Sequence, residues 1–357
     1  MLKAIILFFE GRFFMSKQIL SVATILFVLS VVAYAGPYTE QGVSAFVDSN
    51  GMPSSSDDPN SIINPVFKDW AASIVSYEPT PGVYLRDPCF YDPNMALGPV
   101  TGDLFDVVSL GDLNDAQIEA NVPLGQITLG FNAPVYNGSG CDFVVFENGW
   151  GPVSEGKYWC ELAYVEVSSN GIDFIRFPSV SLTAQLTGRY GLIDITDIYN
   201  LAGKFGEDYS EEQIIFFGTP FDLSEIANDP LVLSGVVNIN DIKYIRIVDV
   251  VGSGNFYDEA THFGYSANHP IYDPWLTWGS EGFDLESIGI LHSHRYHGDI
   301  DLDGIVDFKD LFIMVNSWLK QTGEEGWVPN CDIAEPKDGI VNFLDYAVLA
   351  GDWLKME

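Results

Sequence analysis

Basic residues are scarce in this chain. Among its 357 residues, 16 lysines and arginines stand against 50 aspartates and glutamates, so the net charge is −34. A surface of this sign repels the phosphates of nucleic acids and of anionic lipids, and no basic patch offsets it, so nucleic acid is excluded as a partner. Charged residues are nevertheless only 18% of the chain and aromatic residues 14%. This composition predicts a packed globular protein rather than a disordered acidic tail.

Cysteine and the common catalytic motifs are also scarce. The four cysteines are Cys89, Cys141, Cys160 and Cys331. Their spacing matches no zinc or redox motif, and disulfide bonds are permitted in an exported chain without being required. The sequence has no Gly-x-Ser-x-Gly elbow, no His-Glu-x-x-His helix and no phosphate-binding loop.

Long apolar runs are confined to the N-terminus. Lys17 precedes an apolar run from Ile19 to Val32, and Ala33-Tyr-Ala35 has the small-x-small pattern of a cleavage site. Residues 1–35 are therefore predicted to be a signal peptide, with Met15 as its expected first residue; an uncleaved anchor is the alternative. The mature chain is predicted to have no membrane span and to be secreted or held at the cell surface.

Strand patterns dominate residues 37–292. Segments 126–131 and 164–168 alternate apolar and polar residues, whereas 142–147 and 242–249 are rich in β-branched and aromatic residues. Segment 166–177 has a hairpin pattern, with Asn-Gly at 170–171 as the tight turn. The best helical candidates are short, at 65–76 and 223–228. The chain is therefore predicted to be mainly β: an antiparallel, jelly-roll-like β-sandwich that serves as a binding domain.

Segments 93–99, 107–111, 127–131 and 142–147 follow the order seen in discoidin-like, galactose-binding-type sandwiches, which this region resembles. It also resembles a group of uncharacterised bacterial secreted proteins through the segments 146–148, 161–168 and 282–285. Both resemblances imply a fold more than an activity. The histidines at 292, 294 and 297 are interpreted as part of a linker, residues 293–297, rather than as a metal site.

Residues 299–310 have the spacing of an EF-hand-type calcium loop. Acidic side chains occupy positions 1, 3, 5, 9 and 12, the carbonyl of position 7 is a further ligand, and glycine stands at position 6. Carboxylates this close repel one another unless a cation lies between them, and many hard oxygen ligands favour calcium. The predicted ligands are Asp299, Asp301, Asp303, Ile305, Asp307 and Asp310.

The loop and the apolar segment after it are repeated. Residues 303–319 recur as 338–354, and each copy ends in Trp-Leu. Each predicted helix is too short to be stable alone, so the two copies are expected to pack together. Residues 298–357 thus resemble a type I dockerin, a small α-helical calcium-loop module. The resemblance implies a cohesin-like partner, although positions 10 and 11 hold Phe308-Lys309 and Phe343-Leu344, where dockerins carry small polar residues.

The second loop departs from the pattern. If Asp332 is its position 1, two extra residues precede Asp338; counting back from Gly339 instead places Ala334 and Pro336 at positions 1 and 3, where neither offers a side-chain ligand. A metal in this loop would be bound by Asp332, Asp338, the carbonyl of Ile340, Asn342 and Asp345.

The β region has candidates of its own. A structural calcium site is one interpretation of the strand-end and loop aspartates, and turn capping is the other; these residues are Asp194, Asp197, Asp249, Asp258, Asp273 and Asp284. A glycoside hydrolase would need two carboxylates such as those of Glu147, Glu161 and Glu166, which equally suit a solvated strand edge. Loop tryptophans would stack on a sugar or close the ends of the sandwich; they are Trp150, Trp159, Trp275 and Trp278.

These patterns together predict an exported, non-enzymatic protein. Its β domain would bind a glycan or another surface component, and its calcium-bound tail would attach it to a cohesin-like or cell-envelope protein. A polysaccharide-degrading hydrolase carrying a dockerin is one alternative, because dockerins are usually carried by such enzymes. A structural surface-layer component is the other.

Overall fold

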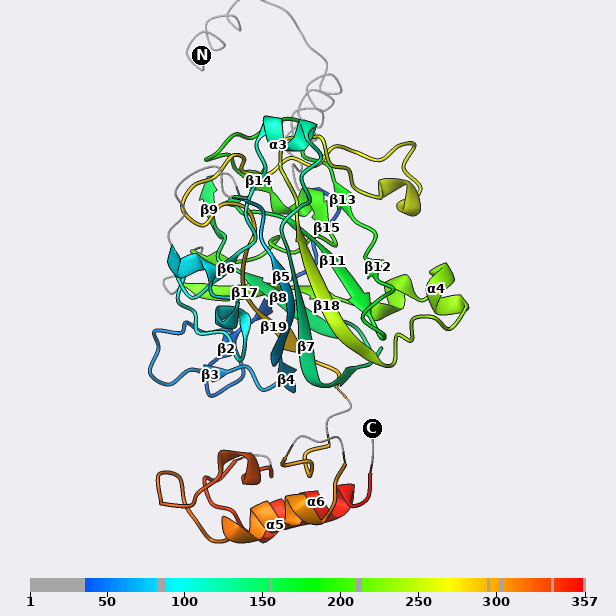
Figure 1. The fold of residues 1–357 in the computed structure, drawn as a ribbon. Coiled ribbons are helices and arrows are strands. Elements are labelled where there is room, and N and C mark those ends of the chain that lie inside the picture. The colour runs from blue at the N-terminus through cyan, green and yellow to red at the C-terminus, as the bar shows by residue number, and fades with distance from the viewer. Residues whose placement is uncertain are drawn as a thin grey trace, which may run out of the picture.

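The computed structural model describes residues 36–81, 88–154, 156–209, 214–293, 296–301, 305–334 and 337–355 (Figure 1). The predicted signal peptide lies outside the described residues, as do Asp303 and Gly304 of the first loop. Within the described ranges, no helix combines the length and the apolar character needed to cross a membrane.

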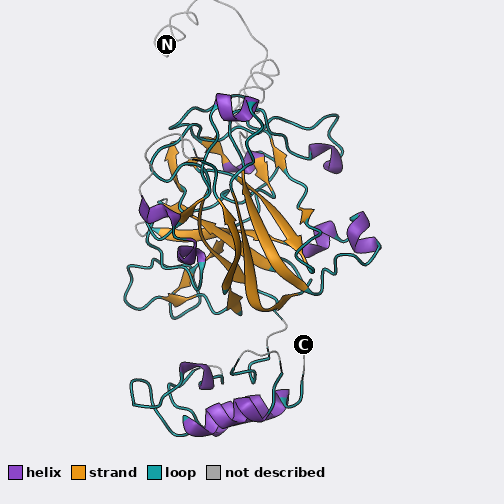
Figure 2. Ribbon diagram, in the orientation of Figure 1, coloured by secondary structure: helices purple, strands orange, loops and turns teal. Residues whose placement is uncertain are grey.

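The prediction of a mainly β chain is confirmed (Figure 2). The larger of two main sheets has the strand order β14 (Ile193–Asp194), β10 (Lys157–Trp159), β9 (Trp150–Ser154), β16 (Glu207–Asp208), β17 (Ile215–Phe221), β8 (Phe143–Glu147), β19 (Asp284–Ile290) and β4 (Asp69–Trp70), with β1 (Val43–Ser44) on β17 and β6 (Val108–Ser109) on β19. The smaller sheet has the order β12 (Ile175–Arg176), β11 (Ala163–Ser168), β18 (Ile242–Asp249), β7 (Gln126–Val135) and β5 (Ser73–Glu78).

Neighbouring strands of the smaller sheet are antiparallel, and in the larger sheet only β16 and β9 run parallel. Two small pairs complete the strands: β13 (Val180–Ser181) with β15 (Ile198–Tyr199), and β2 (Phe46–Val47) with β3 (Ile62–Ile63).

One hydrophobic cluster joins the two main sheets. Phe143 and Ile288 of the larger sheet contribute to it together with Val165, Ile245 and Ile247 of the smaller sheet. All five side chains are buried, and their β-branched or aromatic shapes suit a pleated surface. Burial of this apolar surface is the main force that holds the two sheets in one β domain, residues 36–293.

Helices in the β domain are short. They are η1 (Pro88–Tyr91), η2 (Pro93–Ala96), α3 (Asp115–Glu119), η3 (Ile195–Asp197), η4 (Leu223–Ile226), α4 (Pro230–Leu233) and η5 (Ala260–Phe263). The helix expected near 223–228 is present as η4. The helix expected over 65–76 is wrong, because this segment forms β4 and most of β5. Ile74 and Tyr77 instead add an edge strand to β7.

The predicted hairpin at 166–177 is present, but its turn is longer than expected. Strands β11 and β12 pair Glu166 with Arg176 and Val167 with Ile175. Between them Asn170 accepts hydrogen bonds from two backbone amides, those of Ile172 at 2.8 Å and Asp173 at 2.9 Å. The Asn side chain therefore organises a wider loop, as Asn does in Asx-turns.

The tail module, residues 296–355, has a core of its own. Helices α5 (Phe308–Asn316) and α6 (Phe343–Asp352) follow the two loops, and η6 (Pro329–Cys331) lies between them. Met314 of α5 and Leu349 of α6 are fully buried in one cluster with Val306, Val341 and Cys331. Figure 2 shows both long helices of the described chain in this unit.

Candidate metal centres

The first predicted calcium loop is closed by Asp310, a buried residue in the first turn of α5. Its Oδ1 accepts the backbone N–H groups of Ile300 at 2.6 Å and Asp301 at 3.0 Å, and its Oδ2 accepts that of Asp307 at 2.8 Å. Asp307 caps the helix by accepting the N–H of Lys309 at 2.7 Å. Position 12 therefore binds the start of the loop to the start of the helix.

Three of the predicted ligands converge. Oxygens of Asp299, Asp301 and Asp310 lie within 4.8 Å of one another, and Asp299 and Asp310 are buried. Carboxylates at this separation repel one another in a poorly hydrated setting unless a cation compensates them. Asp307 and Ile305 are described but are not part of this triad, and Asp303 lies outside the described residues. Hard carboxylate oxygens of this kind fit calcium.

The second loop repeats the geometry around Asp345. Its Oδ1 accepts the N–H groups of Ile333 at 2.7 Å and Ala334 at 2.9 Å, and its Oδ2 accepts that of Asn342 at 2.8 Å. Ile333 and Ala334 therefore correspond to Ile300 and Asp301. This places Asp332 at position 1 and Ala334 at position 3, which decides between the two registers that the sequence allows.

The second loop offers fewer acidic ligands. Ala334 has no ligand atom at position 3, and the amide of Asn342 donates to Asp338 at 2.9 Å and to the carbonyl of Ile340 at 3.0 Å. Asp332 is buried, and its Oδ1 has no hydrogen-bond partner among the described residues. Burial, opposed by the backbone of Gly339, raises the pKa of the Asp332 carboxyl. The loop is therefore a weaker candidate than the first.

The two loop–helix units bind each other reciprocally. Val306 of the first loop accepts the N–H of Leu354 at 2.8 Å, and Val341 of the second loop accepts that of Leu319 at 2.8 Å. The N–H groups of Val306 and Val341 in turn donate to the carbonyls of residues 355 and 320. Each valine at position 8 is therefore paired with the segment that follows the other helix.

Aromatic contacts follow the same symmetry. Phe308 packs edge-on against Trp353, and Phe343 packs against Trp318, both with ring centroids 5.0 Å apart. The phenylalanines at position 10 still expose 75% of their surface. Further apolar side chains are exposed on the same module, namely Phe312, Val315, Leu319, Leu344 and Leu354. Exposed apolar side chains are therefore present in both loop–helix units of the tail.

The β domain contains a second group of carboxylates, which we call the acid cluster. Its members are buried and lie close enough to act on one another electrostatically; they are Asp112, Glu147, Glu161, Asp249, Asp273, Glu281 and Asp284. Five were candidates from the sequence, although as two separate sets. Asp112 and Glu281 were missed, because both lie in irregular segments and no motif marks them.

The remaining sequence candidates are used elsewhere. Asp194 caps η3 by accepting the N–H of Thr196, and Asp258 accepts the N–H of Ser181 and contacts His269. Asp197 is partly exposed. Glu166 forms ion pairs with Arg176 at 2.8 Å and Arg246 at 3.2 Å. These residues do not join the acid cluster.

Burial dominates the electrostatics of the cluster. It raises the pKa of Glu161 well above its usual value, and the neighbouring Asp284 and Glu147 raise it further. Burial likewise raises the pKa of Glu147 and of Asp273, the latter against the opposing N–H of Leu162. Burial of the Cys160 thiol beside these acids raises its pKa as well. The site therefore disfavours negative charge in the absence of a cation.

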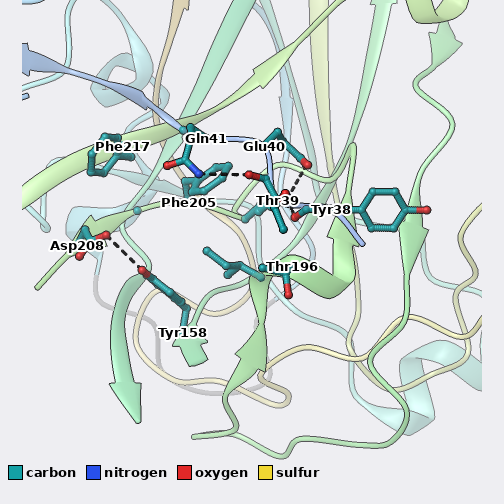
Figure 3. A pocket seen from close by; sticks show the side chains of 13 residues that line it. Tyr38, Thr39, Glu40, Gln41, Tyr158, Thr196, Phe205, Asp208 and Phe217 are labelled. Atoms are coloured by element: carbon teal, nitrogen blue, oxygen red, sulfur yellow. Dashed lines mark hydrogen bonds and ion pairs between the residues drawn. The ribbon is translucent and has the colours of Figure 1, made fainter. Parts of the chain in front are cut away.

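A surface cavity of about 230 Å³ lies elsewhere in the β domain (Figure 3). Aromatic rings of Tyr158, Phe205 and Phe217 line it together with polar groups, and the Tyr158 hydroxyl donates to Asp208 at 3.2 Å. Lys204 is buried beside it and donates to the carbonyl of Tyr38 at 3.0 Å. Apolar ring faces beside hydrogen-bonding groups are the features that sugar-binding pockets combine.

The four loop tryptophans divide into two kinds. Trp275 donates to the carbonyl of Leu113 at 2.9 Å, and Trp159 donates to that of Arg189 at 3.2 Å, so both are held by the fold. Trp150 stacks on Trp159 and remains exposed, as does Trp278. The Arg189 guanidinium lies over the Trp278 ring, 4.6 Å from its centroid.

Comparison with known proteins adds no assignment. The chain matches no protein-family model, and a search of curated proteins found no similar sequence.

Proposed function

We propose that this chain is an exported, non-enzymatic protein whose dockerin-like tail folds around calcium and attaches it to a partner at the cell envelope. The observation that carries the proposal is the duplicated loop–helix unit, in which Asp310 and Asp345 make the same three backbone hydrogen bonds. The convergence of Asp299 and Asp301 on Asp310 supports calcium in the first loop.

Calcium would act on the tail by neutralising the first loop. The ion would compensate the repulsion between the three carboxylates and hold the loop against α5, and the reciprocal contacts would then fix the second unit on the first. Extracellular calcium is concentrated enough to fill even weak sites. Export therefore suits the chemistry of this module.

The apolar surface of the tail supports a protein partner. Phe308 and Phe343 are each 75% exposed at position 10, where the dockerin resemblance implies contact with a cohesin-like protein. Their size and apolar character differ from the small polar residues of dockerins. The partner surface is therefore expected to be an apolar one that accepts aromatic side chains.

In this proposal the β domain is an antiparallel, jelly-roll-like sandwich that binds a glycan. The cavity beside Tyr158, Phe205 and Phe217 supports this part of the proposal. The hydrolase alternative gains no support from Glu147 and Glu161, because their exposures of 0% and 2% give a sugar no access to either carboxyl group in this conformation.

Binding of the mature chain to isolated cell envelopes tests the attachment, in calcium and in excess chelator. The proposal expects retention in calcium, release in chelator, and loss of retention when Phe308 and Phe343 are both replaced by serine. Calcium-independent retention, or retention unchanged in the double variant, would refute it. A glycan array, followed by incubation of any bound sugar with the protein, tests the β domain; new reducing ends would show a hydrolase instead.

A further inference from the structure

The acid cluster lies where strands of both sheets end. Glu147 is the last residue of β8, and Leu285, next to Asp284, is its partner on β19. Asp249 is the last residue of β18 and pairs with Ala163 at the start of β11. Glu161 comes two residues before that strand. The two sheets thus bring carboxylates from distant parts of the sequence to one end of the β domain.

Loop residues complete the cluster. Asp273 Oδ2 accepts the N–H of Leu162 at 2.7 Å, which fixes the 272–283 loop beside Glu161. Asp112 Oδ2 accepts the N–H of Thr277 at 3.4 Å. In each aspartate, Oδ2 therefore accepts a backbone N–H, whereas Oδ1 makes no such bond.

Several buried oxygens of this cluster have no hydrogen-bond partner among the described residues. They are Oδ1 of Asp112, Oε1 of Glu147, both carboxylate oxygens of Glu161 and Oδ1 of Asp273. The hydroxyl of Thr277 is the one neutral side chain among the groups that act most strongly on Glu161, and it lies outside normal hydrogen-bond geometry. These four side chains expose 2% of their surface or less. Buried polar atoms in folded proteins are nearly always paired, so oxygens of this kind indicate a missing partner.

Other buried acids of the same chain show how the fold satisfies a carboxylate. Asp142 accepts the N–H groups of Gly138 and Leu223, both at 2.7 Å, and contacts His292. Glu286 accepts those of Thr101 and Gly102 at 2.7 and 2.9 Å. The acid cluster differs from these two examples, and no lysine or arginine is among the groups that act most strongly on its four members with unpaired oxygens.

The electrostatic neighbours show that these four side chains surround one region. Glu147 and Asp112 both raise the pKa of Glu161, and Asp273 raises the pKa of the same two residues. The four carboxylates therefore form a closed ring of neighbours. A doubly charged cation at its centre would supply the absent partner for five oxygens, and hard oxygen ligands in this number favour calcium over zinc.

We propose that the β domain binds a calcium ion through four buried carboxylates, those of Asp112, Glu147, Glu161 and Asp273. The ion links the ends of β8 and β11 to the loops at 110–113 and 272–283. Among the described residues, only the tail triad brings oxygens of three acidic side chains within 4.8 Å of one another. An ion in the β domain therefore draws the four carboxylates closer together or completes its coordination with water. This site is independent of the tail loops.

Calcium titration of the mature chain tests this site. The background is a chain with Asp310→Asn and Asp345→Asn, which weakens the tail loops and leaves the β domain unchanged. Calorimetry of this background is expected to show one bound calcium, and the further substitution Glu161→Gln is expected to abolish it. The matched control is Glu166→Gln, which alters a glutamate of β11 that is paired with Arg176 of β12 and Arg246 of β18 and is expected to leave the binding in place.

Thermal denaturation gives a second readout. In chelator, Glu161→Gln is expected to raise the melting temperature of the β domain, because it removes repulsion from the ring. In calcium it is expected to lose the stabilisation that the parent chain gains. No calcium bound to the background chain, or equal binding with and without Glu161→Gln, would overturn the proposal. A parallel titration of the chain without the tail substitutions keeps the two hypotheses separate, because failure of the tail hypothesis would appear there as calcium binding that the two substitutions do not reduce.

Discussion

Replacing Asp310 by asparagine gives a quantitative test of the first tail loop. The asparagine Oδ1 can still accept the N–H groups of Ile300 and Asp301, but its amide faces the N–H of Asp307. One charge-assisted hydrogen bond is lost and two become neutral, which together costs about 2–5 kcal/mol of the stability of the module. This is a large part of the total stability expected for a unit of this size.

The substitution Asp345→Asn is the matched control. Asp345 makes the same three hydrogen bonds in the second loop, at 2.7, 2.9 and 2.8 Å. In chelator the two variants should therefore lose similar amounts of stability. In calcium they should differ, because Asp310 belongs to the convergent triad whereas Ala334 removes a ligand from the second loop. The triad should stabilise the Asp345→Asn chain by about 2.7 kcal/mol more when calcium is at about 100 times its Kd.

Hydrogen–deuterium exchange of the mature chain measures this difference, because the amides of α5 and α6 report the opening of the tail without interference from the β domain. The expected result is similar exchange of the two variants in chelator and slower exchange of Asp345→Asn in calcium. A difference that is the same with and without calcium would rule out metal binding by the triad as its cause, since the two substitutions would then differ in hydrogen bonding.

Three individual side chains can be tested by substitution. Burial raises the pKa of Glu286 from 4.5 to about 8. The free energy of unfolding therefore falls as the pH rises between these two values, because the folded chain must lose a proton from a buried carboxyl group. Glu286→Gln should leave the melting temperature unchanged below pH 4.5 and should raise the free energy of unfolding at pH 7 by about 3 kcal/mol, as measured by denaturant titration. Phe205→Ala should weaken glycan binding to the β domain about tenfold through loss of a stacking face, as measured by calorimetry. Trp353→Ala should remove the packing of Phe308 and lower the melting temperature of the tail, with a cost of about 3–5 kcal/mol. If a substitution leaves the stability or the glycan affinity of the chain unchanged in its assay, the role given to that side chain is wrong.

Much of the β domain could be predicted from local sequence patterns. The segments 126–131, 142–147, 164–168 and 242–249 lie in β7, β8, β11 and β18, because β-branched and aromatic residues suit buried strands. The segment 65–76 was misassigned as a helix, since its pairing with β7 depends on residues far away in the sequence. Strand order and the shared core likewise depend on contacts that no local pattern encodes.

The candidate sites likewise divide into those that local sequence patterns predict and those that depend on long-range contacts. The loop at 299–310 was predicted because its ligands are close in sequence, and the structure brings three of them together. The register of the second loop was open, and it was decided only by the hydrogen bonds of Asp345 to Ile333 and Ala334. The acid cluster was not recognised as one group, because strand pairing and loop packing unite its members. Asp112 stands in an irregular segment without any motif.

Calorimetric titration of the metal-free mature chain with calcium directly measures whether the first tail loop holds a calcium ion. We expect saturable binding that falls by one equivalent when Asp310 is replaced by asparagine. An absence of binding heat, or a stoichiometry that this replacement leaves unchanged, would contradict it.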